Sequence, residues 1–458
     1  MSNEAVDSQA RVTVAPTSTR RAVLNTVKGS AGNLVEWYDV YIYTVFATYF
    51  EAQFFDKDDA NSTLYIYAIF AVTFVMRPVG AWFFGRYADR RGRKAALILS
   101  ISVMSSCSFL VAIMPTREVI GYWAAVILIA ARLVQGFATG GEYGTSATYM
   151  SEASTARRRG FLSSFQYVTL IGGHVLAQFT LLILLNVLDS EALHDWGWRI
   201  GFFIGGIAAL VVLWIRRTMD ESLSESHLAD IREGKDKDAG SLKALFTTHW
   251  RNLLLVFLIT AGGTVAFYTY SVNAPAIIKS TFGADRALTA TWVNLLGLIF
   301  LLLLQPLGGL ISDTVGRRPL LIFFGVGGVF YTYVLLTFLP QTTSAVTAFA
   351  LTAVGYVILT GYTSVNAIVK AELFPAEFRA LGVGLGYALA NSAFGGTAPL
   401  LFQAAKAADR PNAFIVYVTV IIGVSLLVYI FWLKNKAMTA LDREQGSAWE
   451  VPASSAAR

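Results

Sequence analysis

GRYADRRGRK, residues 85–94, is a short charged turn between two long apolar stretches. The turn GLISDTVGRR, residues 309–318, repeats its Gly, Asp, Gly and Arg at identical spacing, 224 residues further along the chain. Glycine allows two helices to approach closely, and charged residues keep the turn in water. The repeat therefore indicates a chain built from two halves on one plan, an arrangement typical of membrane transporters.

A second pattern is repeated with nearly the same offset. Glu152 stands seven residues before Arg159, and Glu372 stands seven residues before Arg379, an offset of 220 residues. Both pairs follow the fourth apolar stretch of their half, as the Gly/Asp/Arg turns follow the second. Two independent repeats in this order predict an internal duplication into parallel six-helix halves.

The composition predicts an integral membrane protein. Of the 458 residues, 55% are hydrophobic and only 14% are charged, and the mean hydropathy is +0.55. Soluble domains carry about 25% charged residues, so this chain is too apolar for that class. Apolar runs of membrane-spanning length predict twelve helices, at residues 31–52, 63–85, 95–115, 121–143, 160–187, 198–217, 252–274, 288–311, 319–339, 345–369, 381–404 and 413–433.

The expected fold class follows from these helices. It is an all-α integral membrane protein with twelve transmembrane helices in two pseudo-symmetric six-helix halves. The expected domains are an N-terminal tail, a first bundle, a linker, a second bundle and a C-terminal tail, at residues 1–28, 29–217, 218–250, 251–434 and 435–458.

Basic residues gather in the loops on one side of the predicted helices. That side holds Arg20, Arg21, Arg157 and the turn 85–94, whereas the opposite loops hold few cations, such as Lys57. This positive-inside pattern places both termini, the linker and the repeated turns in the cytoplasm. The pI of about 9.2 therefore reflects membrane topology, and no nucleic-acid partner is expected.

Several classes of function are excluded by the residues that the sequence lacks. A single cysteine, Cys107, and four histidines provide neither a disulfide framework nor a metal cluster. No Gly-x-x-x-x-Gly-Lys-Ser/Thr loop is present to bind ATP, so we expect no enzyme activity and no bound cofactor. An ion gradient or the substrate's own gradient must supply the energy, and the residues alone do not decide between protons and sodium.

Five short motifs resemble those of a known family. The turn at 85–93 and RLVQG at 132–136 are similar to signatures of the major facilitator superfamily. GNLVEWYD at 32–39, GGEYG at 140–144 and ELFP at 372–375 resemble the metabolite:proton symporter family within it. The resemblance covers nearly the whole chain. It implies a monomeric, multi-pass protein of the bacterial cytoplasmic (inner) membrane, with the proton as coupling ion.

The resemblance also implies a substrate class. SFQYVTLIGG at 164–173 is most similar to family members that carry alpha-ketoglutarate, although His174 stands where Gln is expected. We therefore expect proton-coupled symport of alpha-ketoglutarate or a similar dicarboxylate, with this small carboxylate, protons and the lipid bilayer as partners. The alternatives are a symporter of proline, betaine, shikimate or citrate, and a non-transporting sensor on the same scaffold.

Charged side chains within the apolar stretches mark the expected chemistry, because a charge inside the bilayer requires a partner or a cavity. Asp39 and Arg132 lie at similar depth, and Glu36 and Arg77 lie one turn lower, so we expect two ion pairs. A carboxylate that loses its arginine to the substrate gains proton affinity, which links binding to protonation. The residues expected to couple protons are Asp39, Glu36 and Glu142.

Substrate-binding groups are expected from both halves. Arginine presents a bidentate fork to a carboxylate, whereas the uncharged candidates are also compatible with plain helix packing. The expected substrate-binding residues are Arg77, Arg132, His174, Gln178, Tyr268, Asn273, Tyr362 and Asn366. Lys370, at the inner end of the tenth helix, is expected to extend its ammonium group to the membrane surface.

The repeated turns and the Glu/Arg pairs are expected to form a gate at the cytoplasmic face. An Asp at a helix end can cap a neighbouring helix or pair with Arg, and such contacts hold two halves together until they rock apart. The alternative is that these charges only anchor the loops in water. The expected gate residues are Gly85, Asp89, Arg90, Gly92, Arg93, Asp313, Gly316, Arg317, Glu152, Arg159, Glu372 and Arg379.

Overall fold

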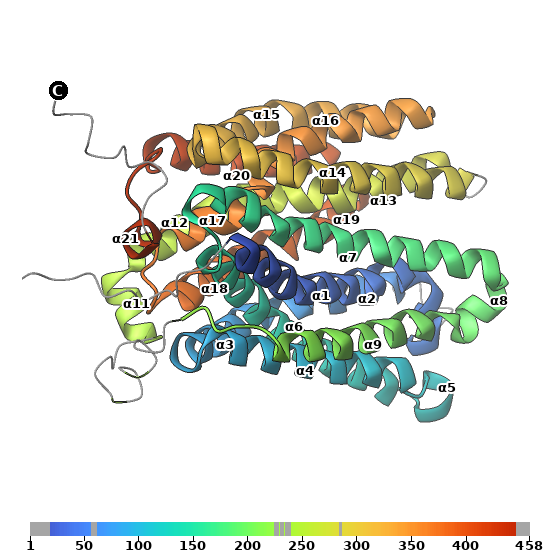
Figure 1. Ribbon diagram of the computed structural model, residues 1–458. Coiled ribbons are helices and arrows are strands. Elements are labelled where there is room, and N and C mark those ends of the chain that lie inside the picture. Colours follow the sequence, from blue (N-terminus) through green and yellow to red (C-terminus); the bar gives the residue numbers. More distant parts are fainter. Residues whose placement is uncertain are drawn as a thin grey trace, which may run out of the picture.

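The structure is a computed structural model that describes residues 19–55, 62–223, 229, 233, 240–283 and 286–445. Every regular element in these ranges is a helix, and the long helices run side by side along a common axis (Figure 1). The predicted tails and linker lie partly outside the described residues.

Six membrane-length segments form the first half of the chain. They are α1 (Thr19–Phe54), α2 with α3 (Ser62–Val75 and Arg77–Arg91), α4 (Arg93–Ile113), α6 (Trp123–Glu152), α7 (Arg159–Val187) and α9 (Trp198–Arg217). The connections contain α5 (Arg117–Ile120), η1 (Ala156–Arg158), α8 (Ser190–Ala192) and η2 (Leu193–Gly197). The chain breaks between α2 and α3 because Pro78, in the first turn of α3, has no N–H to continue the helix.

Six further segments form the second half. They are α12 to α13 (Trp250–Tyr268, η3 Thr269–Asn273, Ala274–Phe282), α14 (Ala287–Val315), α15 (Arg317–Phe338), α16 with α17 (Ala345–Thr363 and Asn366–Ala371), α18 to α19 (Arg379–Ala390, η6 Asn391–Gly395, Ala398–Ala407) and α20 (Pro411–Phe431). Shorter helices are α11 (Leu242–Thr248), η5 (Leu339–Gln341) and α21 (Ala440–Gln445). The π-helical turns η3 and η6 precede Pro275 and Pro399, where regular helix hydrogen bonding cannot continue.

Helix covers each predicted membrane segment within the described ranges. Ten of the segments are also long and apolar enough to cross a membrane by length and composition. The two that fall short have physical reasons to do so. α1 carries Glu36 and Asp39 in its interior, and the path from α18 to α19 is divided by a turn at Gly396.

α1 begins earlier than its predicted start at residue 31. It runs from Thr19, so the predicted tail 1–28 ends inside the helix. The additional turns mix polar and apolar residues, and the Lys28 ammonium donates to the Thr218 carbonyl at 2.8 Å. A helix needs no apolar sequence where it leaves the bilayer, so hydropathy underestimates its length.

A few long helices join the two halves. α7 packs along α14, and α18 packs against α3 and α6. At these contacts a side chain on Gly85 would meet the backbone of Leu381, and one on Gly309 would meet the backbone of Phe161. The first glycine of each repeated turn therefore permits the halves to approach closely.

The two repeated turns lie at the same end of the bundle, which we call the motif face. Gly92 and Gly316 end α3 and α14 there with φ angles of 99° and 95°, a backbone region that favours glycine. α11 and α21 lie at this face, on the left in Figure 1, and α5 and α8 lie at the opposite end.

Candidate functional site

A narrow cavity lies between the two halves. Its side chains pack so closely that no space large enough for a water molecule remains between them. The first half lines it with Glu36, Trp37, Arg77, Thr139, Gly140 and Tyr143, and the second half lines it with Tyr387 and Ala388. A carboxylate, a guanidinium and two tyrosines therefore meet where the halves join.

Glu36 and Arg77 both line this cavity, but they do not form the predicted ion pair. Both Glu36 oxygens, and Nε and Nη2 of Arg77, lack a hydrogen-bond partner among the described residues. The Arg77 guanidinium instead lies over the Phe74 ring at 3.9 Å and the Trp37 ring at 5.4 Å. The prediction rested on the similar depth of Glu36 and Arg77 in the membrane. Whether two side chains at one depth meet depends on the directions in which they point, and here the aromatic rings hold the Arg77 guanidinium.

Asp39 and Arg132 form the predicted pair, with 3.5 Å between Oδ2 and Nη1. Shorter bonds come from two side chains to which the sequence reasoning assigned no role. Gln135 donates to Asp39 at 2.7 Å, and Ser108 donates to it at 2.6 Å. Gln135 also accepts from Arg132 at 2.6 Å, so it bridges the pair. Gln135 lies three residues after Arg132 on the same helix face, and this spacing could have predicted the contact between them.

His174 lies flat against Tyr41, with ring centroids 3.7 Å apart and planes 5° from parallel. The side chain is buried, and Nδ1 has no hydrogen-bond partner within the described chain. Gln178 lies one turn further along α7 and is half-buried. The stack ties α7 to α1 and leaves one ring nitrogen unsatisfied in the interior.

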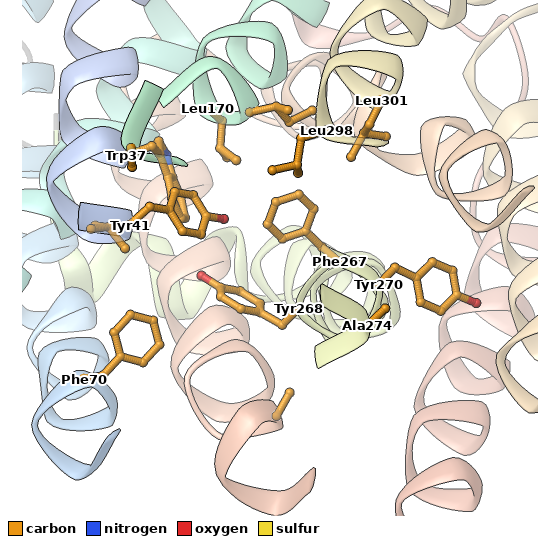
Figure 2. Close-up of a cluster of buried hydrophobic side chains, with 14 of the residues drawn as sticks. Trp37, Tyr41, Phe70, Leu170, Phe267, Tyr268, Tyr270, Ala274, Leu298 and Leu301 are labelled. Atoms are coloured by element: carbon orange, nitrogen blue, oxygen red, sulfur yellow. The ribbon is translucent and has the colours of Figure 1, made fainter. Parts of the chain in front are cut away.

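Polar groups of the second half lie near this region. Tyr268 on α12 and Tyr41 on α1 extend toward the same space, among the apolar side chains that surround them (Figure 2). The Tyr41 hydroxyl has no hydrogen-bond partner in the described part of the protein, whereas the Tyr268 hydroxyl lies beside the Arg77 and Asn391 side chains. Asn273 is buried in the π-helical turn η3, and Tyr362 is buried on α16.

α17 places two polar side chains against the first half. Asn366 donates to the Tyr143 hydroxyl at 2.7 Å and to the Tyr167 hydroxyl at 3.0 Å. Lys370 follows one turn later, is fully buried and donates to Tyr143 at 3.3 Å. The prediction that Lys370 reaches the membrane surface is wrong, because α17 packs against α6 and α7 and covers this face of the helix.

Glu142 is not among the side chains that line the cavity. It forms a buried ion pair with Arg216 and accepts from Ser100 at 2.8 Å. The sequence analysis assigned no role to Arg216. α9 ends at Arg217, as predicted, and its last turn carries the Arg216 guanidinium into the interior. Glu142 is therefore neutralised in place, unlike Glu36.

The first repeated turn is tied to the second half. Asp89 accepts from the N–H groups of Ala380 and Leu381, at 3.2 and 3.0 Å, and so caps the N-terminus of α18. Arg93 contacts Asp89 at 2.5 Å and Glu152 at 3.2 Å. Helix capping and ion pairing thus meet at one aspartate across the junction of the halves.

Glu152 extends this network to the second half. It pairs with Arg379 at 2.8 Å and accepts from Ser222 at 2.6 Å. Asp89, Arg93, Glu152 and Arg379 are all fully buried. Separating the halves here would expose or strand these charges, so the network favours a closed motif face.

The second repeated turn has the same geometry in a more exposed setting. Asp313 accepts from the N–H groups of Gly160 and Phe161, at 2.7 and 2.9 Å, and so caps α7. Arg317 pairs with Asp313 at 3.1 Å and with Glu372 at 3.3 Å. These charged side chains keep 9–11% of their surface exposed, so water weakens their attraction.

The short helix α21 adds carboxylates that the sequence reasoning did not assign. Asp442 pairs with Arg159 at 2.6 Å, and Glu444 pairs with Arg379 at 2.7 Å. Burial raises the pKa of Glu444, and the Arg379 charge opposes this shift. Arg90, also expected in the gate, is half-buried at the end of α3. No spacing pattern connected α21 with the repeated motifs.

The helical architecture defines a class of membrane transporters, the major facilitator fold. The proton:xylose symporter XylE bound to 6-bromo-6-deoxy-D-glucose matches with a TM-score of 0.77 over 94% of this chain and 100% of that chain, at 19% identity. An inward-open XylE structure from E. coli matches with a TM-score of 0.62 over 92% and 98%, at 21% identity. The predicted fold class is confirmed.

The chain belongs to the Sugar (and other) transporter family, whose model matches residues 24–443. It is 41% identical to the alpha-ketoglutarate permease of Escherichia coli (strain K12), over 93% of this chain and 97% of that relative. It is 30% identical to a citrate-proton symporter of Klebsiella pneumoniae, over 82% and 83%. It is 29% identical to the proline/betaine transporter of Escherichia coli (strain K12), over 76% and 71%. The protein is thus a multi-pass membrane transporter and not an enzyme.

Proposed function

We propose that the protein is a proton-coupled symporter of alpha-ketoglutarate or a similar small dicarboxylate. The observation that carries the proposal is Arg77, a buried guanidinium at the inter-half cavity with two nitrogens that lack a partner among the described residues. An arginine fork of this kind suits a carboxylate. The relatives named for alpha-ketoglutarate and citrate support an anionic substrate.

Coupling is assigned to Asp39. A bound substrate whose oxygen atoms draw the Arg132 guanidinium away leaves Asp39 buried without its cation, and such a carboxyl group takes up a proton more readily. Substrate and proton then occupy the protein together, as symport requires. Glu36 is the second proton acceptor in this proposal, because its buried carboxylate lines the cavity. Glu142 holds its helices together through Arg216.

The remaining candidates take supporting roles in the proposal. His174, Gln178, Tyr268, Asn273, Tyr362 and Asn366 supply hydrogen bonds to a bound substrate as the halves move. The motif face is cytoplasmic, with both termini on that side of a bacterial inner membrane, and the protein acts as a monomer. The charge networks of the repeated turns form the cytoplasmic gate, so the structure corresponds to a state closed on that side.

A zwitterionic substrate is the second candidate. Glu36 lines the same cavity as Arg77, and a carboxylate and a guanidinium together suit a molecule with both charges, such as proline or betaine. The relative named for proline and betaine belongs to the same group of matches. The two candidates differ in the role of Glu36. With a dicarboxylate substrate Glu36 binds a proton, and with a zwitterionic substrate it binds the cationic group of that substrate.

The test uses purified protein in proteoliposomes with an inward proton gradient. We expect labelled alpha-ketoglutarate to accumulate, and we expect a protonophore to abolish accumulation while a sodium gradient has no effect. Excess unlabelled citrate, betaine and proline report the substrate range by competition. Accumulation of betaine or proline without alpha-ketoglutarate would replace the first candidate by the second, and accumulation of none of them would favour a sensor.

A further inference from the structure

Lys370 is the feature from which a further inference follows. It lies on α17 in the second half and is fully buried. Among the described residues, no carboxylate lies within salt-bridge distance of its ammonium group, which donates to the Tyr143 hydroxyl at 3.3 Å. A buried ammonium without a counter-ion is unfavourable, whereas an exposed lysine would pay no such penalty.

The surroundings of Lys370 are aromatic. Its Nζ lies 4.4 Å from the centroid of the Tyr387 ring, 5.1 Å from that of Tyr143 and 6.0 Å from that of Tyr362. Ring faces attract a cation, but they compensate only part of the lost hydration. The site therefore suits a positive charge and still lacks an anion.

Tyr143 and Tyr387 contact Lys370 and also line the cavity. Their rings are stacked with centroids 3.5 Å apart, and each tyrosine comes from a different half. Both also line the cavity that holds Arg77. The stacked pair thus contacts Lys370 and also lines the Arg77 cavity, so a movement of the halves that parts the rings changes both sites together.

We infer that Lys370 is a substrate-binding residue that receives the second carboxylate of a dicarboxylate whose first carboxylate is held by Arg77. This inference rests on the proposed function and specifies its substrate class. Arg77 belongs to the first half and Lys370 to the second, so a molecule with two carboxylates spans both halves. A monocarboxylate binds at one cation only and leaves the other buried without an anion. Lys370 therefore determines the preference for dicarboxylates.

The test compares dicarboxylate and monocarboxylate binding to the purified full-length protein in detergent. The probes are alpha-ketoglutarate and 2-oxopentanoate, which has the same chain length and one carboxylate fewer. Lys370→Met removes the charge and keeps an apolar side chain of similar length. We expect it to weaken alpha-ketoglutarate binding about 10- to 100-fold, the effect of losing one charge-assisted contact, and to leave 2-oxopentanoate binding unchanged.

Three further variants make the result specific. Lys370→Gln repeats the test if the methionine variant does not fold. Lys370→Arg keeps the charge and should retain most of the preference. Lys279→Met removes an exposed lysine from α13 and should leave both affinities as in the wild type. A purely structural role for Lys370 would lower both affinities together.

The outcomes separate this inference from the proposed function. If the wild type prefers alpha-ketoglutarate and Lys370→Met or Lys370→Gln keeps that preference, the inference is overturned and the proposed function stands. If the wild type binds no dicarboxylate, the proposed function fails before any variant is compared, and the inference fails with it. Selective loss of the dicarboxylate, restored by arginine, supports both.

Discussion

Asp39 has three hydrogen-bonding neighbours, and only one of them is a cation. Gln135 and Ser108 donate at 2.7 and 2.6 Å, whereas Arg132 stands at 3.5 Å. Arg132 also donates to Gln135, and its guanidinium lies 4.0 Å from the centre of the Tyr43 ring. These two contacts hold the Arg132 side chain in place even when its contact with Asp39 is lost. The ion pair can therefore open without disordering either side chain, which is what a coupling carboxylate needs.

The first prediction concerns Asp39→Asn. Asparagine mimics the protonated carboxyl group, so substrate still exchanges across the membrane but the proton gradient no longer drives uptake. A pH difference of one unit supplies about 1.4 kcal/mol per proton, or about tenfold accumulation, and this factor should be lost. Accumulation and counterflow of labelled substrate in proteoliposomes measure the two activities separately.

Asp409→Asn, at an exposed position, is the matched control for Asp39→Asn. It should accumulate substrate as the wild type does. Equal loss of accumulation and exchange in Asp39→Asn would remove Asp39 from the coupling role and direct attention to Glu36.

At the scale of single elements, each repeated turn acts as a cap for a helix of the other half. Asp89 caps α18 and Asp313 caps α7, and each aspartate also pairs with the arginine four residues later in its own turn. A side-chain cap contributes about 0.5–2 kcal/mol, and the partial positive charge of the helix N-terminus favours the carboxylate. The motif thus ties the two halves together at the motif face through the N-terminal ends of α18 and α7.

The second prediction compares Asp89→Asn with Asp313→Asn. Each change removes a charge and one acceptor oxygen from a cap, and about 1.4 kcal/mol corresponds to a tenfold shift in an equilibrium. We expect Asp89→Asn to open the motif face about tenfold more often and Asp313→Asn to have a smaller effect, because the second network is partly exposed.

The readout is alkylation of Ala147→Cys in a Cys107→Ser background. Ala147 is fully buried on α6 in an apolar cluster with Phe374 and Leu381 of the second half, so its reaction rate reports opening of the motif face. Unchanged rates in Asp89→Asn, or a larger effect of Asp313→Asn, would contradict the assignment of the first turn as the stronger latch.

The third prediction concerns the docking of α21. The raised pKa of Glu444 means that the docked helix binds a proton more readily than the released one. Docking is therefore strongest below the ordinary glutamate pKa of about 4.3 and weakens as pH rises through the interval between that value and the raised pKa. Hydrogen exchange of residues 440–445, corrected for the intrinsic effect of pH, should show less protection across this interval.

Two charged groups act on Glu444 from the elements packed against it, and the Ala376 N–H donates to it at 3.1 Å. Arg379 favours its ionised form, and Glu152, on the same guanidinium, opposes it. Glu444→Gln removes the titrating group and should make protection independent of pH in this interval. Protection that changes with pH equally in the variant would assign the effect to another group.

At the scale of the whole molecule, the proposed transport cycle requires the two halves to separate at one face while they close at the other. Much of the closed motif face depends on small residues that let backbones meet. A side chain added at Gly144 on α6 would strike the backbone of Gly384 and Ala380 on α18. Close packing of this kind excludes even one methyl group unless the halves move apart.

The fourth prediction is therefore that Gly144→Ala shifts the protein toward an open motif face. A cost of about 1–3 kcal/mol for overpacking corresponds to a shift of roughly 5- to 150-fold, measured as faster alkylation of Ala147→Cys. Gly423→Ala, at a helical glycine with open space around it, is the matched control and should leave the rate unchanged. Equal rates in both variants would show that the α6–α18 contact does not limit opening.

Sequence patterns anticipated the parts of the site that repeat or that follow helix geometry. For Asp89 the sequence left open capping of a neighbouring helix and pairing with Arg93, because an aspartate at a helix end suits both, and the structure shows both contacts. Asp39 and Arg132 were predicted from equal depth, and the same argument failed for Glu36 and Arg77. Depth in the membrane follows from residue number, but the direction of a side chain depends on how its helix is rotated in the bundle.

The sequence by itself determined the helical membrane fold, the duplication and the residues of the repeated turns. These features depend on the hydropathy of continuous segments, on residue spacing and on glycines at helix ends, all of which are local properties of the chain. Only the tertiary structure decided the partners that meet across it. Arg216 neutralises Glu142, α21 binds Arg159 and Arg379, and Lys370 is enclosed by tyrosines from both halves. These contacts join residues that are far apart in sequence. They form because one helix face packs against another, and no local sequence pattern specifies that packing.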